Sequence, residues 1–148
     1  FTNFPAEPCN LVYKSTDSGP GSLRYALSCA LPGDTIRFSY LVLTDTLHLQ
    51  SPLTVDKNIV ILGQDEYPLV ITAANADRAI HILPGVSCEL SQVQLFGGNL
   101  SSGSCIQNEG SLIANGVKCF KGAQPAPASL LLNMSGASVE YRGTNQIK

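Results

Sequence analysis

Two different periodicities of apolar residues divide the chain. After the turn-rich stretch 17–21, apolar side chains occupy positions 23, 26, 27 and 30. Residues three, four and seven positions apart lie on one face of an α-helix, so this spacing predicts an amphipathic helix over residues 22–30 with Ser22 as its N-cap. Pro32 and Gly33 are typical of a segment where a helix has ended.

From residue 35 onward, short runs of alternating apolar and polar residues replace the helical period. Runs such as 35–38, 59–62 and 93–96 are separated by Gly, Asn and Pro. A period of two places successive side chains on opposite faces of a strand, so we expect an all-β protein. The residues expected to point into its interior are Ile36, Phe38, Leu47, Leu49, Ile59, Ile61, Ile80, Ile82, Val93, Leu95 and Phe120.

An internal repeat indicates how these strands are arranged. Three positions recur at one constant spacing: Val93 as Val117, Phe96 as Phe120 and Gly98 as Gly122. A weaker copy begins at Gly136, which follows Gly110 at a slightly longer spacing. Repeats of about 20 to 30 residues built only from strands and turns are typical of stacked β-coils, which bury their apolar faces against one another. We therefore expect a solenoid, because a sandwich of hairpins needs many two-residue turns such as Asn115-Gly116.

Several phrases resemble bacterial cell-surface proteins with right-handed parallel β-helix repeats. They are Asp-Ser-Gly-Pro-Gly-Ser-Leu-Arg at 17–24, Pro-Gly-Asp-Thr-Ile-Arg-Phe at 32–38, and the segments 53–63 and 78–82. The resemblance covers most of the chain and is specific over residues 10–98. It implies a right-handed parallel β-helix with a short N-terminal capping helix, export to the cell surface, and a structural or adhesive function. Residues 1–34 would form the N-terminal segment and cap, and residues 35–148 the coils of one structural domain.

The cysteine spacing limits the possible metal and disulfide chemistry. The five cysteines are Cys9, Cys29, Cys88, Cys105 and Cys119. They form no C-x-x-C pair and have no histidine at ligand spacing, which argues against zinc and haem sites. An odd number allows at most two disulfides within the chain. Cys9 and Cys29 flank the predicted cap, and a bond between them fits the exported protein that the resemblance implies. Cys88, Cys105 and Cys119 can equally be small buried residues.

The composition argues against a disordered chain, a nucleic-acid-binding protein and a membrane-spanning protein. The 148 residues are 44% hydrophobic and 14% charged, with a formal net charge of −2. This is too apolar for a disordered chain and has no basic surplus for binding nucleic acid. No run approaches the roughly 18 apolar residues of a membrane span. We expect no cofactor.

Acidic and histidine side chains offer only weak candidates for chemistry. Asp34, Asp56 and Asp77 precede strands, where aspartate usually forms turns; stacked on one edge of successive coils, they would instead make a calcium site. His48 and His81 each stand between two aliphatic residues and should point to solvent. No two acids share a strand at i, i+2 spacing, so a paired-carboxylate site has no evident position and we expect a non-enzymatic protein.

A polysaccharide-binding or polysaccharide-degrading β-helix is the alternative. It requires acidic and aromatic residues on one face, and Tyr40, Tyr67 and Tyr141 show no evident common register.

Modification and assembly are predicted at a few further residues. Asn99 and Asn133 match the N-glycosylation pattern, and Thr46 is a candidate for an O-linked glycan. Residues 137–148 show no pattern for a cap, so either further coils follow or a second copy stacks on the open end. In the second case, the segment Leu11-Val12-Tyr13 would pair with the neighbour's last coil near Val139 and Tyr141. This head-to-tail contact would build a homo-oligomeric filament. Surface glycans are the other expected partner.

Overall fold

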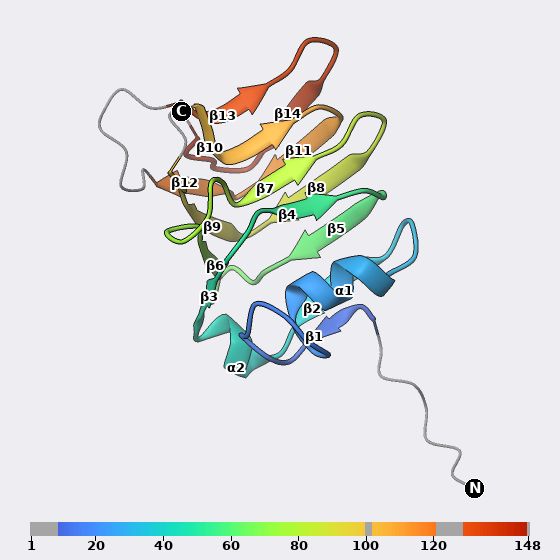
Figure 1. Ribbon diagram of the computed structural model, residues 1–148, viewed down its shortest axis with the longest axis vertical. Helices are drawn as coiled ribbons and strands as arrows, with labels where there is room; N and C mark the ends of the chain where they lie inside the picture. Colours follow the sequence, from blue (N-terminus) through green and yellow to red (C-terminus); the bar gives the residue numbers. More distant parts are fainter. Residues whose placement is uncertain (1–8, 100–101, 121–128, 148) are drawn as a thin grey trace, which may run out of the picture.

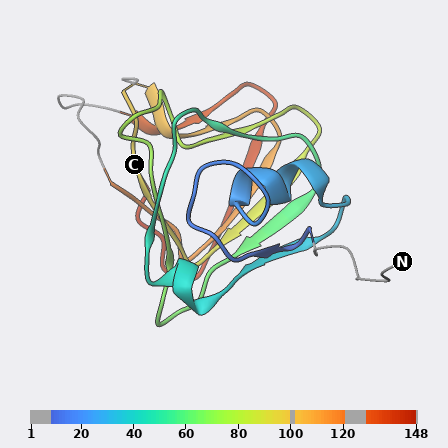
Figure 2. The same cartoon turned by 60° about the horizontal axis from the view of Figure 1, so that its bottom comes forward.

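The computed structural model describes residues 9–99, 102–120 and 129–147. Its strands form three parallel sheets that stack as a β-solenoid of about five coils (Figure 1). Viewed from its N-terminal end, the solenoid has a triangular outline with one sheet on each side (Figure 2). The predicted parallel β-helix is therefore confirmed.

Each of the four coils from β2 to β13 contributes one strand to each sheet, and β1 and β14 extend the first sheet at its two ends. The first sheet contains β1 (Leu11–Val12), β2 (Thr35–Phe38), β5 (Ile59–Leu62), β8 (Ser87–Ser91), β11 (Ser111–Asn115) and β14 (Ser138–Arg142). The second contains β3 (Thr46–His48), β6 (Leu69–Thr72), β9 (Val93–Phe96) and β12 (Lys118–Phe120). The third contains β4 (Leu53–Val55), β7 (Ile80–Ile82), β10 (Ser102–Asn108) and β13 (Ser129–Asn133). We call the bend from the first to the second sheet the first corner, that from the second to the third sheet the second corner, and that from the third back to the first the third corner.

The sequence repeat corresponds to strand pairing. Phe96 lies opposite Phe120, as the repeat predicts. The weaker third copy is displaced by one position from its expected alignment, because Ser111 pairs with Ser138 where the repeat aligned it with Ala137. The turn after Asn133 is longer than the equivalent turn after Asn108, and this shifts β14 along the chain.

The interior is a column of aliphatic side chains. All the residues predicted to point inward are buried except Phe120. In β12 the inward position belongs to Cys119, which is 5% exposed, and Phe120 stacks outside on Phe96 with ring centroids 4.8 Å apart. The prediction for Phe120 was wrong by one step of the alternation, which moves a side chain to the opposite face of its strand.

Helix α1 (Leu23–Cys29) covers the N-terminal end of this interior, as predicted (Figure 2). The Ser22 hydroxyl accepts a hydrogen bond from the backbone N–H of Tyr25 at 3.1 Å, which makes it the N-cap. Lys57 donates to the Ala30 carbonyl just beyond the other end of the helix. A one-turn helix, α2 (Tyr40–Leu43), was not predicted; it buries Val42 and Leu43 at the first corner. Neither helix of the described chain has the length and apolar character needed to cross a membrane.

The segment before α1 is held within its own chain. Strand β1 pairs with β2 in parallel, with Leu11 opposite Arg37 and Val12 opposite Phe38. A disulfide joins Cys9 to Cys29, whose Cα atoms are 5.5 Å apart, and this confirms the predicted pairing. The segment that leads into β1 is thus linked to the capping helix by a covalent bond.

A buried polar side chain fastens the last coils together. Asn108, at the end of β10, is fully buried. Its Nδ2 donates to Asn133 Oδ1 and to the Ser138 carbonyl, both at 2.8 Å, and its Oδ1 accepts from the Gly110 N–H at 3.1 Å. Every polar atom of this side chain therefore has a partner, as a buried amide requires.

Candidate functional site

The most varied group of polar side chains lies in a groove along the first corner. The groove has a volume of about 320 Å³. Its lining residues are Asp65, Pro68, Gln92, Gln94, Asn115, Gly116, Lys118, Gly143 and Thr144. They come from the second coil to the last described one, so the groove runs parallel to the solenoid axis.

The strand register explains why these side chains share one surface. Gln94 and Lys118 lie opposite each other in the second sheet, and both alternate with inward-facing residues. Adjacent strands lie about 4.8 Å apart, so the amide and the ammonium group form neighbouring steps of one ladder. An oligomeric ligand lying along the axis would meet one such step for each coil.

Gln92 adopts a backbone conformation that is unusual for its residue type. Its φ is +54°, and it is the only residue other than glycine with a positive φ in the described part of the chain. A side chain at Gly116, one coil further on, would collide with the Gln92 amide. The Gln92 side chain therefore lies directly over Gly116. The positive φ of Gln92 itself is one that glycine adopts more readily than other residues.

Two tyrosines lie at the same corner, although the sequence showed no common register for them. Tyr40 begins α2 in the first coil, and Tyr67 precedes β6 in the second. Their rings meet edge to face with centroids 5.0 Å apart, and they are 58% and 37% exposed. A hydrogen bond with Tyr67 raises the pKa of Tyr40 above its usual value. Tyr141 lies elsewhere, in β14 of the first sheet.

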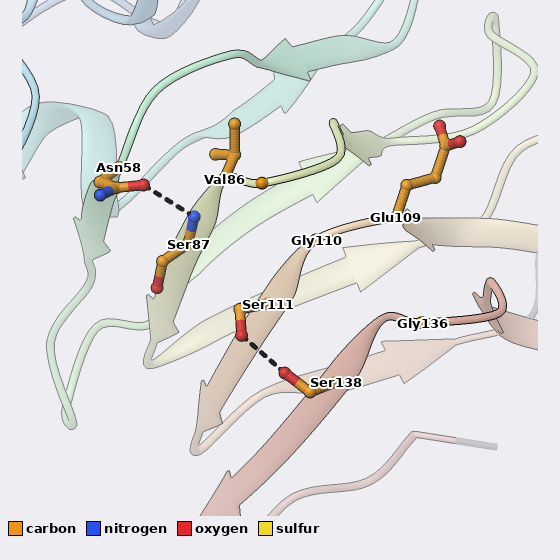
Figure 3. Close-up of a pocket in the computed structure, with 9 residues that line it drawn as sticks. Asn58, Val86, Ser87, Glu109, Gly110, Ser111, Gly136 and Ser138 are labelled. Atoms are coloured by element: carbon orange, nitrogen blue, oxygen red, sulfur yellow. Dashed lines mark hydrogen bonds between the residues drawn. The ribbon is translucent and has the colours of Figure 1, made fainter.

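A second groove, of about 370 Å³, follows the third corner (Figure 3). Ser87, Ser111 and Ser138 begin successive strands of the first sheet and lie in register along it. The hydroxyl oxygens of Ser111 and Ser138 are 2.6 Å apart, and the Ser87 N–H donates to Asn58 Oδ1 at 2.9 Å. This groove therefore presents small hydroxyls, which partly satisfy one another.

A glycine at the third corner allows the backbones of two successive coils to approach closely. A Cβ atom at Gly110 would collide with the backbone carbonyl oxygens of Val86 and Leu83. The third corner must therefore remain glycine at this coil, and the groove exposes the chain backbone there.

A polar cluster lies beside this groove on the third sheet. His81 Nε2 hydrogen bonds to the Glu109 carboxylate, and Arg78 donates to the Gln107 amide oxygen. Partial burial lowers the pKa of Arg78, while the charges of Asp77 and Glu109 oppose this shift. His48 is exposed as predicted, but His81 has an acidic partner, distant in the sequence, that only the stacking of β7 on β10 reveals.

The three aspartates considered as a calcium site do not lie on one edge. Asp34 and Asp56 are at the third corner, whereas Asp77 is at the second, between β6 and β7. Asp34 accepts a hydrogen bond from the Leu31 N–H at 2.9 Å, and Asp56 lies 3.9 Å from the Lys57 ammonium. Among the described residues, no group of three or more potential ligands is arranged to hold a metal ion.

The predicted modification residues lie in three different settings. Thr46 begins β3 on the second sheet, and Asn99 is exposed at the second corner. Asn133 is an inward-register residue at the end of the fourth coil, where its amide bonds to Asn108 and to the Ala137 carbonyl. A glycan on Asn133 would compete with this second bond.

Comparison with family models, curated proteins and solved structures finds no match for this chain.

Proposed function

We propose that this protein is an exported, non-catalytic adhesive solenoid that binds extended surface glycans along its first-corner groove. The observation that carries the proposal is the meeting of Tyr40 and Tyr67 at the corner that also bears the groove. Amides, a carboxylate and an ammonium group line the groove and supply both donors and acceptors for sugar hydroxyls. The exposed tyrosine rings supply apolar faces with a polar tip.

The length of this surface also fits an extended ligand. Asp65 lies in the second coil, Gln92 in the third and Asn115 in the fourth, with Thr144 in the last. Three steps between coils amount to about 14 Å at the usual strand spacing. A linear polymer of several sugar units can contact every step, whereas a single small molecule would occupy only one.

The Cys9–Cys29 disulfide supports export. Stable disulfides persist in oxidising compartments and are rare in the cytosol. Secretion to the cell surface would place the groove where surface glycans are available.

The proposal is tested by measuring binding of the 148-residue chain to an array of soluble neutral and acidic polysaccharides. Tyr67→Ala and Gln94→Ala should each weaken binding about tenfold, which corresponds to about 1.4 kcal/mol. Ser111→Ala is the matched control, because it removes a hydroxyl from the third-corner groove and should leave binding unchanged. Equal losses in all three variants, or no binding to any polysaccharide, would overturn the proposal. Release of sugar fragments would favour the polysaccharide-degrading alternative.

As a second proposed function, head-to-tail assembly rests on the inward-register side chains of β14, which are exposed or half-buried in the described part of the chain. Tyr141 stands opposite the fully buried Ala114, so its register points inward, yet it is 55% exposed. Val139 is half-buried beside it. In a head-to-tail filament, β14 of one copy would pair with β1 of the next.

The existing contacts of residues 11–13 determine how a neighbouring copy would bind to them. Leu11 and Val12 are already paired with their own β2, and Tyr13 leaves the strand to pack over Gly21. The segment would therefore receive β14 on the outer edge of β1, without leaving its own chain. Sedimentation at increasing concentration should show growing polymers for the intact chain and monomers for Tyr141→Lys, which places a charge at the contact. A monomeric intact chain would contradict head-to-tail assembly without affecting the glycan proposal.

A further inference from the structure

Two of the three free cysteines meet inside the solenoid. Cys105 belongs to β10 of the third sheet and Cys119 to β12 of the second. Both point inward, and they are 0% and 5% exposed. Cys88 lies on the remaining sheet, in β8, opposite Leu112.

The contacts of Cys105 place its sulfur against the strands that carry Cys119. Cys105 Sγ is 3.7 Å from the carbonyl oxygen of Leu95, the register partner of Cys119. It is 3.8 Å from the carbonyl oxygen of Phe120, the residue that follows Cys119. The side chains of Cys105 and Cys119 also interact directly. The two sulfurs are therefore neighbours across the second corner, on consecutive coils.

We propose that Cys105 and Cys119 form a second disulfide, which links the third coil to the fourth and leaves Cys88 as the single free thiol. The bond forms by exchange with an oxidised small-molecule disulfide such as oxidised glutathione. One cysteine thiolate attacks the oxidant and releases one reduced thiol. The other cysteine then attacks the mixed disulfide, forms the Sγ–Sγ bond and releases the second reduced thiol, so that two protons and two electrons are accounted for.

Burial determines when this reaction can occur. The hydrogen bond with Cys105, together with burial, raises the pKa of Cys119 far above that of an exposed thiol. Because the thiolate is the nucleophile, the folded protein reacts very slowly. The disulfide should therefore form while the chain folds, and the completed core should then protect it from reductants.

The number of free thiols provides the first test. The chain is refolded in reduced and oxidised glutathione, denatured at low pH, alkylated with N-ethylmaleimide and weighed intact. We expect one label per chain at Cys88, whereas three labels would overturn the proposal. Cys105→Ala and Cys119→Ala should each carry two labels, because the remaining partner becomes free. Cys88→Ala is the matched control and should carry none.

Peptide mapping of the unmodified chain remains decisive if a variant fails to fold. Cleavage after Lys, Arg and Glu separates the three cysteines into peptides 79–89, 90–109 and 119–121. Without reduction, peptide 90–109 should be recovered linked to peptide 119–121. Recovery of 79–89 in a linked product, or of three unlinked peptides, would show that the inferred disulfide is wrong.

Discussion

Replacement of Asn108 by alanine should weaken the solenoid more than its small change in volume implies. Asn108 is fully buried and makes three hydrogen bonds, to Asn133, to the Ser138 carbonyl and to the Gly110 N–H. Each such bond contributes a net of about 1 kcal/mol, and a buried group left without a partner costs about 1 to 3 kcal/mol. We therefore expect the free energy of unfolding to fall by about 3 to 4 kcal/mol.

Asn133→Ala is the matched control for this prediction. Asn133 occupies the equivalent position one coil later, but it is exposed, and water can replace the bonds that it loses. Its loss should cost about 1 to 2 kcal/mol, clearly less than the loss of Asn108, because Asn108 loses one bond but keeps those to Ser138 and Gly110. Guanidinium unfolding followed by circular dichroism measures both values. A loss for Asn108→Ala no greater than that for Asn133→Ala would refute the claim that the buried amide holds the last coils together.

Three further predictions concern the corners and the interior. Gly110→Ala should destabilise the protein or prevent folding, because its Cβ would collide with the Val86 carbonyl; thermal unfolding measures this, and an unchanged midpoint would contradict the close approach. Leu95→Ala should lower the free energy of unfolding by about 2 to 5 kcal/mol in denaturant titration, and Phe120→Ala should lower it clearly less, since Leu95 is fully buried whereas Phe120 lies outside the core. A larger loss for Phe120→Ala would show that Phe120 belongs to the core. Burial raises the pKa of Cys88 from 9.0 to about 12. Because the thiol of the unfolded chain ionises first, the free energy of unfolding should fall as the pH rises across that interval, and it should fall less for Cys88→Ala.

The interior could be predicted because alternation is a local property of the sequence. Ile59 and Ile61 face inward whichever strand lies beside them, and so do Ile80 and Ile82. The inward prediction for Phe120 was wrong because it followed the size and apolarity of the ring; alternation within 117–120 places Val117 and Cys119 inward and Phe120 outward. The repeat contains the missing information, because Phe120 pairs with the outward-facing Phe96.

The groups at the corners could not be predicted in the same way, because they depend on the lengths of several coils. The stretch of chain between Val60 and its register partner Glu89 is longer than the stretch between Glu89 and its own next partner, Ile113. A regular spacing of aspartates along the sequence therefore does not place them at one corner. For the same reason, the contact between Tyr40 and Tyr67 becomes visible only when the first two coils are stacked.

This division between interior and corners has a consequence for the candidate binding surface. Each coil is stabilised mainly by inward-facing side chains that contact the coils next to it, as in other solenoids. Tyr67 does not belong to the buried core, and its ring packs on the exposed ring of Tyr40, so its removal leaves the core side chains in place. The side chains proposed to bind glycans at the first corner should therefore vary almost independently of stability. Tyr67→Ala should weaken glycan binding with little change in unfolding free energy, whereas a variant that lost both together would place Tyr67 among the residues that hold the fold.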